Sequence, residues 1–494
     1  MATRSRPNIV YLFSDQHRHD AMGCAGNSVI QTPNLDELAS RGVRFSRTYC
    51  QSPICQPSRA SIITGLYTHQ HGVTHNVIKD FKPELPNMMK QLKKADYTTA
   101  QIGKTHYYSP RRDRILKDIK GTGDNAEFDM REYDDFVRSF GFDYVLEEFD
   151  RYLHASSGVK FITPYTEYLE AKGLLEPYKK QVSSVWRLTP NHWNGLTSVL
   201  PQEDDLTSFL ADEAIKWLRN YHSDNPFYLT VSFVQPHVPL MDDHVWADYY
   251  KDAEIPPGPR QAPESPNEVW GNYLENSLFK HSNSHLLSDE YVLNAARHYY
   301  GMVSLIDQRI GDIIKTVEEL GWKDNTWFIY SSDHGEMLGD HNLMAKMNFY
   351  KSSVLVPAII TPPEIKDPRV IDGVVESIDL NATILDIAGA EPLAASNARS
   401  LLPFVNGEGS PREVAFSSIG YRGENRGYYF MAATEKYRLT FEWNTGTPCE
   451  LFDLDEDPDE LHNLVNDPAY QAVREEIIKK YLEPHFALQN VAIK

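Results

Sequence analysis

A short segment of the chain, Cys55-Gln56-Pro57-Ser58-Arg59, combines residue types that could support nucleophilic chemistry. Proline suits the first turn of a helix, so the segment predicts a helix that begins near Cys55. At that position a side chain lies close to free backbone N–H groups and to the positive end of the helix dipole. Arg59 is four residues further on and therefore shares a helix face with Cys55. This setting favours an anionic nucleophile or an anionic ligand.

Polar side chains follow three apolar segments at the point where each segment ends. The segments are predicted to be buried strands, and they are Asn8–Phe13, Phe227–Phe233 and Trp327–Tyr330. The first is followed by Asp15, the second by His237, and the third by Asp333 and His334. Because open α/β sheets bind ligands at the carboxyl ends of their strands, these side chains are expected to form one site. Asp15 and Asp333 could instead cap helices, but two of them with a nucleophile between them favour the site.

Helical segments alternate with these strands. They are expected at Asn34–Arg41, Leu85–Lys94, Asp205–Tyr221 and Tyr299–Leu320. Such alternation is typical of an α/β fold with a mostly parallel sheet. Between about residues 107 and 201 the chain is irregular, aromatic and rich in charge, which predicts a long insertion over the sheet. Its residues Tyr165, Trp186 and Trp193 could stack on a sugar or an aryl ring, or could equally belong to the core.

The character of the chain changes after the strand and helix expected within Val374–Ala388. Glu391–Pro411 is rich in small residues and turn formers, which places a domain boundary there. Three further strands and a closing helix are expected at Glu413–Ser418, Gly427–Ala433, Tyr437–Trp443 and Tyr470–Leu482. We therefore predict a catalytic domain over residues 1–390 and a smaller C-terminal domain over residues 391–494, built on an antiparallel sheet.

Composition narrows the classes of function. The 494 residues can bury a large core, and 41% hydrophobic with 24% charged residues is ordinary for a globular protein. The formal net charge of −20 argues against nucleic-acid binding and against long-range attraction of a highly sulfated polymer. A small or locally anionic substrate in a confined basic pocket fits better. Four cysteines do not make a disulfide framework in so long a chain.

Neither a membrane span nor a signal peptide is expected. The apolar stretch Val354–Ile360 is short and contains Pro357, whereas a span needs a long uninterrupted run. The segment Met1–Pro7 runs straight into a strand and lacks the apolar core of a signal peptide. The chain as given is therefore expected in the cytoplasm, or in the periplasm or outside the cell if a leader has been removed. The sequence leaves the oligomeric state open and is compatible with a homo-oligomer.

The segment Cys55–Arg59 resembles the C-x-P-S-R signature of the type I sulfatases, which belong to the alkaline phosphatase superfamily. Further segments resemble landmarks of that family, occur in the family's order and span most of the chain. They are Asp15-Gln16, Gly103-Lys104-Thr105-His106, Asp333-His334-Gly335-Glu336, Gly339-Asp340-His341 with Lys346, Val374–Ala388 and Phe452-Asp453-Leu454. The resemblance implies an alkaline-phosphatase-like fold, in which helices sandwich a large, mostly parallel sheet and a smaller C-terminal α+β domain follows.

The resemblance also implies a nucleophile and a divalent metal. Cys55 would be oxidised after translation to formylglycine by a formylglycine-generating enzyme, and the hydrated aldehyde would be the nucleophile. The metal ligands would be Asp15, Gln16, Asp333, His334 and the side chain made from Cys55, with Asp333 also the base of the first step. Oxygen ligands suit Ca²⁺, the first choice, or Mg²⁺, whereas the imidazole suits Mn²⁺ better. The cation would polarise an ester oxygen and lower the pKa of the nucleophile.

Five basic residues acquire roles from the same resemblance. Arg59 would hold the hydrated aldehyde, and Lys104 and His106 would contact both it and the bound sulfate. His237 or Lys346 would contact the substrate and protonate the departing oxygen. His106 would take the proton of the second hydroxyl as sulfate leaves.

Two positions depart from the commonest sulfatase pattern. Many sulfatases carry Asp where this chain has Gln16, and Asn where it has His334. Both residues resemble the phosphonate and phosphate ester hydrolases of the superfamily instead. Asn76 also stands at the spacing from the nucleophile of a substrate-contacting asparagine in those enzymes. A neutral Gln16 would leave the metal site less negative than an aspartate would.

The basic pair Lys104 and His106 resembles that of the sulfatases and would touch the transferred group. We therefore expect a sulfatase that cleaves a sulfate monoester of a small molecule or of a terminal sugar. The alternative is a phosphonate monoester or phosphodiester hydrolase of the same superfamily. A non-catalytic ligand-binding relative is expected only if Cys55 stays a thiol.

Some of these residues have plainer interpretations. His237 alone could be a loop histidine, and Lys346 alone could be a solvated surface lysine. Three histidines have a spacing that could suggest zinc, but Cys50 would have to join them, so a turn with exposed histidines is expected instead. The three are His69, His71 and His75.

Overall fold

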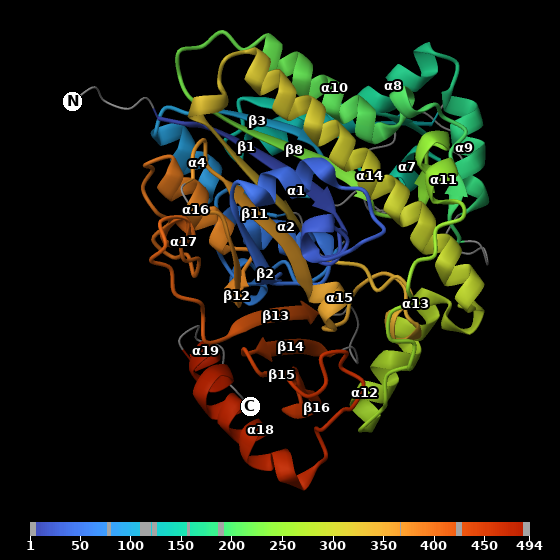
Figure 1. Ribbon diagram of the computed structural model, residues 1–494, viewed down its shortest axis with the longest axis vertical. Helices are drawn as coiled ribbons and strands as arrows, with labels where there is room; N and C mark the ends of the chain where they lie inside the picture. Colours follow the sequence, from blue (N-terminus) through green and yellow to red (C-terminus); the bar gives the residue numbers. More distant parts are fainter. Residues whose placement is uncertain are drawn as a thin grey trace.

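The computed structural model describes residues 6–76, 81–108, 120, 126–155, 159–185, 192–365, 367–420 and 427–487. Within them, eight strands form one sheet in the order β12-β2-β11-β10-β1-β8-β3-β5 (Figure 1). Their bounds are β1 (Asn8–Asp15), β2 (Val43–Tyr49), β3 (Thr98–Gly103), β5 (Tyr144–Glu147), β8 (Phe227–Pro236), β10 (Thr326–Ser332), β11 (Leu355–Thr361) and β12 (Arg369–Glu376). All neighbouring pairs are parallel except those of β11, which runs antiparallel to β10 and β2.

The central strand β1 shows why these segments form strands. Every residue of β1 is buried, as expected for a parallel strand with both faces covered. Its side chains alternate between two cores: Val10 and Leu12 belong to one, and Ile9, Tyr11 and Phe13 belong to the other. The two cores lie on opposite faces of the sheet.

Helices cover both faces of this sheet (Figure 1). The core that contains Val10 includes residues of α1 (Pro33–Ser40), α10 (Leu206–Arg219) and α14 (Asp289–Glu319). The core that contains Ile9 includes residues of α2 (Cys55–Thr64), α4 (Met88–Lys94) and α16 (Asp379–Ile387). The fold is therefore α/β with a mostly parallel sheet between helices, as the sequence predicts.

Helix α14 begins ten residues before its predicted start at Tyr299. The side chain of Ser288 accepts the N–H of Tyr291 and caps the helix, and Asp289 and Glu290 complement the positive end of its dipole. The early turns bury few residues, so their apolar period is weak in the sequence. In the described part of the chain, no helix has both the length and the apolar character needed to cross a membrane.

A second sheet is antiparallel and follows chain order: β13 (Ala415–Gly420), β14 (Tyr428–Ala433), β15 (Tyr437–Glu442) and β16 (Thr447–Asp453). The helices α18 (Gln471–Ile477) and α19 (Glu483–Ala487) flank it (Figure 1). Strand β16 was not predicted, because its apolar pattern is interrupted by Pro448 and by Glu450, a carboxylate that is buried against Arg438. Residues of this sheet and of the large sheet share a hydrophobic core, which joins the two parts.

The prediction of an irregular insertion over residues 107–201 was wrong in one respect, because this segment supplies β5, the edge strand of the large sheet next to β3. It also contains α8 (Pro164–Ala171) and α9 (Leu175–Ser184). Tyr165 and Trp193 are buried in the core of α10 and α14, so neither is available to stack on a substrate. Trp186 lies outside the described residues.

Candidate active site

Four adjacent parallel strands carry polar residues at their carboxyl ends. In the order β10, β1, β8 and β3, these residues are Asp333, Asp15, His237 and Lys104. The register of the strands places their carboxyl ends at the same level. Asp15 of β1 pairs with Pro236 of β8, and Ser14 of β1 pairs with Ser332 of β10. Residues that are more than two hundred positions apart in the chain thus meet at one edge of the sheet.

Helix α2 begins at Cys55 and places this residue against the same edge. Its start is held by Asn76, whose side-chain oxygen accepts the backbone N–H of Gln56 at 2.9 Å. The hydroxyl of Ser58 donates to the backbone oxygen of Asp333 at 2.6 Å, which joins the helix to the end of β10. Every residue of α2 is buried, rather than one stripe, because the large sheet and neighbouring helices surround it.

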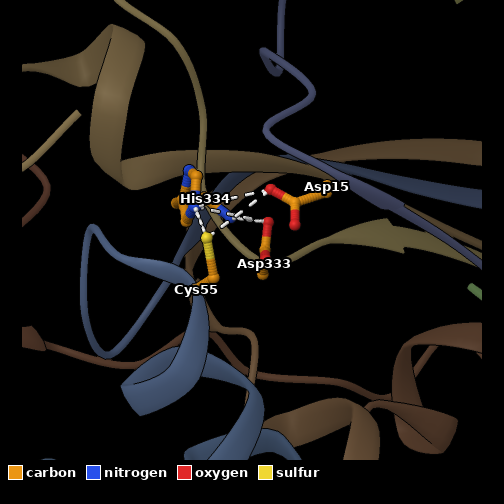
Figure 2. A group of neighbouring side chains, drawn as sticks. All are labelled: Asp15, Cys55, Asp333 and His334. Atoms are coloured by element: carbon orange, nitrogen blue, oxygen red, sulfur yellow. Dashed lines mark hydrogen bonds and ion pairs between the residues drawn. The ribbon is translucent and has the colours of Figure 1, made fainter. Parts of the chain in front are cut away.

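Four side chains from these elements form a compact cluster: Asp15, Cys55, Asp333 and His334 (Figure 2). One possible ligand atom from each lies within 4.8 Å of those from the others, and all four residues are buried. The Cys55 Sγ atom lies 3.2 Å from His334 Nε2 and 3.7 Å from Asp15 Oδ1. His334 Nε2 lies 3.6 Å from Asp333 Oδ1.

The cluster fits a divalent cation. His334 Nδ1 donates to the backbone oxygen of Gly335 at 2.9 Å, so the lone pair of Nε2 faces the cluster. Two buried carboxylates, Asp15 and Asp333, supply hard oxygen donors beside it. These are the residues that would hold a metal ion, and the ion would neutralise charge that is otherwise costly to bury.

Two basic side chains also neutralise the carboxylates. The guanidinium of Arg59 lies 2.8 Å from Asp333 and 3.3 Å from Asp15, and the ammonium of Lys104 lies 2.6 Å from Asp15. Burial by itself would raise the pKa of Asp15, but the positive charges of Lys104 and Arg59 outweigh it and hold that pKa well below its usual range. Asp15 is therefore a carboxylate, as a metal ligand must be.

The thiol of Cys55 is protonated, contrary to the expectation of an anionic sulfur. Burial and the nearby carboxylate of Asp15 raise the pKa of Cys55 to about 11, although Lys346 and Lys104 act in the opposite direction. The unmodified residue is accordingly a poor thiolate nucleophile.

Two buried histidines flank the cluster as neutral bases. Burial, with Lys104 nearby, holds the pKa of His106 well below its ordinary value, and burial with Lys346 does the same to the pKa of His237. The Nδ1 atom of His237 donates to the backbone oxygen of Val238 at 2.9 Å, which leaves the Nε2 lone pair available. Both rings are therefore unprotonated at neutral pH, and the lowered pKa also makes each a weaker base than a free imidazole.

Lys346 is buried and not at the surface, so its interpretation as a solvated lysine is wrong. Its ammonium donates to the side-chain oxygen of Gln16, whose nitrogen donates to Glu336. Gln16 adopts a left-handed backbone conformation with φ 70° directly after β1. The structure thus places Gln16 beside the carboxylate cluster, with its amide held from both sides.

The histidines that follow α2 do not form a metal site within the described residues. His71 is buried and its Nε2 atom lies 3.0 Å from the hydroxyl of Ser61, so the prediction of an exposed histidine is wrong for this residue. Ser61 lies on α2, ten residues before His71, and the sequence alone does not reveal the contact between them.

Three residues beside the site were not predicted to have a role. The hydroxyl of Ser232 on β8 lies 3.0 Å from Arg59 and donates to the backbone oxygen of Lys104 at 2.7 Å. The ring of Phe149 packs edge-to-face on His106, with ring centres 4.7 Å apart. Glu336 accepts a hydrogen bond from Gln16. Of these three residues, only Glu336 could have been suspected from the sequence, because it belongs to the motif Asp333–Glu336.

The mostly parallel sheet between helices, with a buried cluster of acidic, histidine and cysteine side chains at the carboxyl ends of its strands, is the architecture of the alkaline phosphatase superfamily. Within this class the chain belongs to the sulfatase family. The family model described as Sulfatase matches residues 7–390, and the model described as N-sulphoglucosamine sulphohydrolase, C-terminal, matches residues 339–485. The chain is therefore a hydrolase that acts on sulfuric esters.

Known proteins resemble the chain over almost its whole length. An arylsulfatase of Clostridium perfringens is 29% identical over 94% of this chain and 92% of its own length. A choline-sulfatase of Rhizobium meliloti is 28% identical over 94% of this chain and 84% of its own length. The crystal structure of a phosphonate monoester hydrolase of Agrobacterium radiobacter has the same fold, with a TM-score of 0.77, 24% identity, and coverage of 97% of this chain and 95% of that one.

Proposed function

We propose that this sulfatase cleaves a sulfate monoester of a small alcohol or of a terminal sugar, using a formylglycine made from Cys55 and one divalent metal ion. The observation that supports this most strongly is the buried cluster in which the Cys55 Sγ atom lies 3.2 Å from His334 Nε2, beside Asp15 and Asp333. A side chain at this position would share one cation with both carboxylates and the imidazole.

The metal would be held by Asp15, Asp333, His334 and Gln16, together with the side chain made from Cys55. When bound, it would supply positive charge that polarises the ester and favours ionisation of the nucleophile. Carboxylate and amide oxygens favour Ca²⁺, with Mg²⁺ as an alternative, and the imidazole makes Mn²⁺ a third candidate.

The high pKa of the Cys55 thiol supports an oxidised nucleophile over a thiolate. A hydrated aldehyde would supply hydroxyl groups, which are harder ligands than sulfur for such a cation. Arg59 would orient them, and the contacts of its guanidinium with Asp15 and Asp333 support this role. Cys55 is 1% exposed in a wholly buried helix, so a formylglycine-generating enzyme would have to reach it before folding is complete.

The basic residues would divide the remaining work. Lys104 and Arg59 would neutralise the negative charge of the sulfate group. His106 is neutral and would accept a proton from the nucleophile side. Because its depressed pKa leaves His237 unprotonated at neutral pH, Lys346 is the better proton donor to the departing oxygen. His237, Lys346 and Asn76 would contact the substrate.

The alternative function, hydrolysis of a phosphonate monoester or phosphodiester, is favoured by Gln16, His334 and Asn76. Lys104 and His106 favour sulfate. The relatives named for aryl and choline sulfates also direct the proposal to small sulfate esters, and the net charge of −20 is better suited to such substrates than to a polyanion. A homo-oligomer is compatible with this function, and the proposed catalytic domain is residues 1–390.

Peptide mass spectrometry across Cys55 tests the nucleophile. We expect an aldehyde at this residue in protein from a host that contains the maturation enzyme, and a thiol in protein from a host that lacks it. Only the first preparation should turn over aryl sulfate. An active preparation in which Cys55 is wholly unmodified would refute the proposed nucleophile.

A comparison of kcat/KM values for several substrates, measured on one enzyme preparation, tests whether the enzyme prefers sulfate or phosphonate esters. The panel contains an aryl sulfate, choline sulfate, a sugar with a terminal sulfate and an aryl phosphonate. We expect the largest kcat/KM for one of the sulfates, and Cys55→Ala should abolish every activity that uses the site. A clear preference for the phosphonate would support the alternative function.

A further inference from the structure

Glu336 lies behind the site and contacts two parts of it. Its Oε2 atom accepts the side-chain amide of Gln16, while its Oε1 atom accepts the backbone N–H groups of Leu338 at 2.9 Å and Ala345 at 2.6 Å. The carboxylate is fully buried. A single side chain therefore joins the residue that follows β1 to both ends of the loop that precedes Lys346.

This loop has an unusual backbone. Leu338 and Ala345 have φ angles of 48° and 65°, in the left-handed region that non-glycine residues rarely adopt. The N–H of Met337 donates to the oxygen of Ala345 at 2.7 Å, which closes the base of the loop. Glu336 accepts the two N–H groups at that base and so stabilises a conformation that costs free energy by itself.

The donors and acceptors determine how the amide of Gln16 is turned. The ammonium of Lys346 can only donate, so the side-chain oxygen of Gln16 must face it. The nitrogen of Gln16 then faces Glu336 and requires an acceptor there. All the contacts of Glu336 are donations to its oxygens, which are the contacts that a carboxylate needs.

We propose that Glu336 is a positioning residue that holds the amide oxygen of Gln16 toward Lys346 and the metal-ligand cluster, and thereby sets the place of Lys346. This inference rests on the proposed function, in which Gln16 binds the metal and Lys346 meets the substrate. The carboxylate of Glu336 thus lies behind the amide of Gln16, and the oxygen of that amide faces the ammonium of Lys346.

An exchange of the two functional groups tests this relationship. In E336Q the new carboxamide would donate to Gln16, so the amide of Gln16 turns and presents its nitrogen to Lys346. In Q16E two carboxylates would face each other. The double variant Q16E/E336Q restores a donor facing an acceptor and again directs an oxygen toward Lys346, with the atoms of the pair merely exchanged.

Calcium titration of metal-free protein by calorimetry, with the kcat and KM of each variant, provides the readout. We expect E336Q to lower the Ca²⁺ affinity about 10–100-fold and to reduce kcat. The double variant should recover about tenfold or more of the lost affinity, because the two positions are coupled. If its loss equals the product of the two single losses, the inference is overturned.

A matched control separates this role from general damage to the core. Glu376 is also fully buried and accepts a backbone N–H, that of Phe416 at 2.7 Å, but it contacts Tyr67 and Arg412, which lie outside the proposed site. E376Q should lower the Tm without changing the Ca²⁺ affinity. An equal loss of Ca²⁺ affinity in E376Q and E336Q would contradict a positioning role for Glu336.

The failure of this inference is distinguishable from failure of the proposed function. If the wild-type protein neither binds Ca²⁺ nor cleaves any sulfate ester, the proposed function is wrong. The coupling between positions 16 and 336 is then measured on the Tm of metal-free protein, where additive effects would overturn the relationship and a double variant more stable than Q16E would support it.

Discussion

The ammonium of Lys104 lies 2.6 Å from a carboxylate oxygen of Asp15, and both side chains are almost completely buried. Lys104 follows β3 and Asp15 ends β1, with β8 between them in the sheet. The pair therefore joins the ends of β3 and β1 across the intervening strand β8. It also positions a cation where a sulfate group would need one.

Removal of Lys104 should destabilise the metal-free protein. In K104M the carboxylate of Asp15 keeps Arg59 as its neighbour but loses its nearest cation, and breaking a buried pair typically costs about 3–5 kcal/mol. We expect a loss near the lower end of that range in denaturant unfolding with a chelator present. The companion variant D15N/K104M should recover part of the loss, and a K104M effect below about 1 kcal/mol would contradict the pairing.

His334 should control metal affinity through its Nε2 lone pair. We expect His334→Ala to weaken Ca²⁺ or Mn²⁺ binding by at least the 10–100-fold that is typical of supporting residues. His334→Asn retains an amide oxygen, although it is shorter than the imidazole that reaches the cluster through Nε2, so it should weaken Ca²⁺ binding less than alanine does. Calorimetric titration of metal-free protein checks both, and equal affinities for wild type and alanine variant would remove His334 from the ligand set.

The buried carboxyl group of Glu147 should make the free energy of unfolding depend on pH. Burial raises the pKa of Glu147 to about 8 from 4.5, although the N–H and hydroxyl of Thr105 both donate to it at 2.9 Å. Between these two values the folded protein holds a proton that the unfolded chain has released, so the free energy of unfolding falls as the pH rises from about 4.5 to 8. At about 1.4 kcal/mol per pKa unit, the total is on the order of 5 kcal/mol.

The variant E147Q tests this dependence, because an amide oxygen can still accept from Thr105 but cannot ionise. Compared with wild type, E147Q should become progressively more stable as the pH is raised from 5 to 8.5. Denaturant unfolding across that pH range measures the difference in the free energy of unfolding between E147Q and wild type. The other titrating groups are the same in both proteins, so their contributions cancel in this difference. A constant difference between the two proteins would show that Glu147 titrates normally.

Arg438 should hold the second sheet together and attach it to the rest of the molecule. It is buried, lies 2.9 Å from Glu450 and 2.5 Å from Glu460, and covers the ring of Tyr350 with its guanidinium 5.2 Å from the ring centre. Glu460 in turn accepts the backbone N–H of Lys351 at 2.7 Å.

We expect R438M to cost about 3–5 kcal/mol, because it leaves two buried carboxylates without their cation. R438K keeps the charge but cannot form the same pair of directed hydrogen bonds. It should therefore lower the free energy of unfolding relative to wild type, but by less than R438M does. Denaturant unfolding measures both variants. A Tm for R438M equal to that of wild type would contradict this role.

Much of the fold follows from local patterns. The apolar runs that begin at Asn8, Phe227 and Trp327 form strands, and the helices between them form close to their predicted ranges. Strand β16 was missed because its burial depends on a distant partner, as the carboxylate of Glu450 on Arg438 shows, and the first turns of α14 were missed because they bury few residues. A period of apolar residues cannot reveal a buried charge that is paired across a sheet.

The sequence by itself determined which residues have the chemistry of the site: the motif at Cys55, the acidic and basic groups after three strands, and the segment that contains His334. The tertiary structure decided their charge states and contacts. It buries Cys55 and brings Asp15 beside it, which together keep the thiol protonated, and it buries Lys346 and places Glu336 behind Gln16. These outcomes depend on burial and on neighbours up to 320 positions away, which strand order and register create and local sequence does not encode.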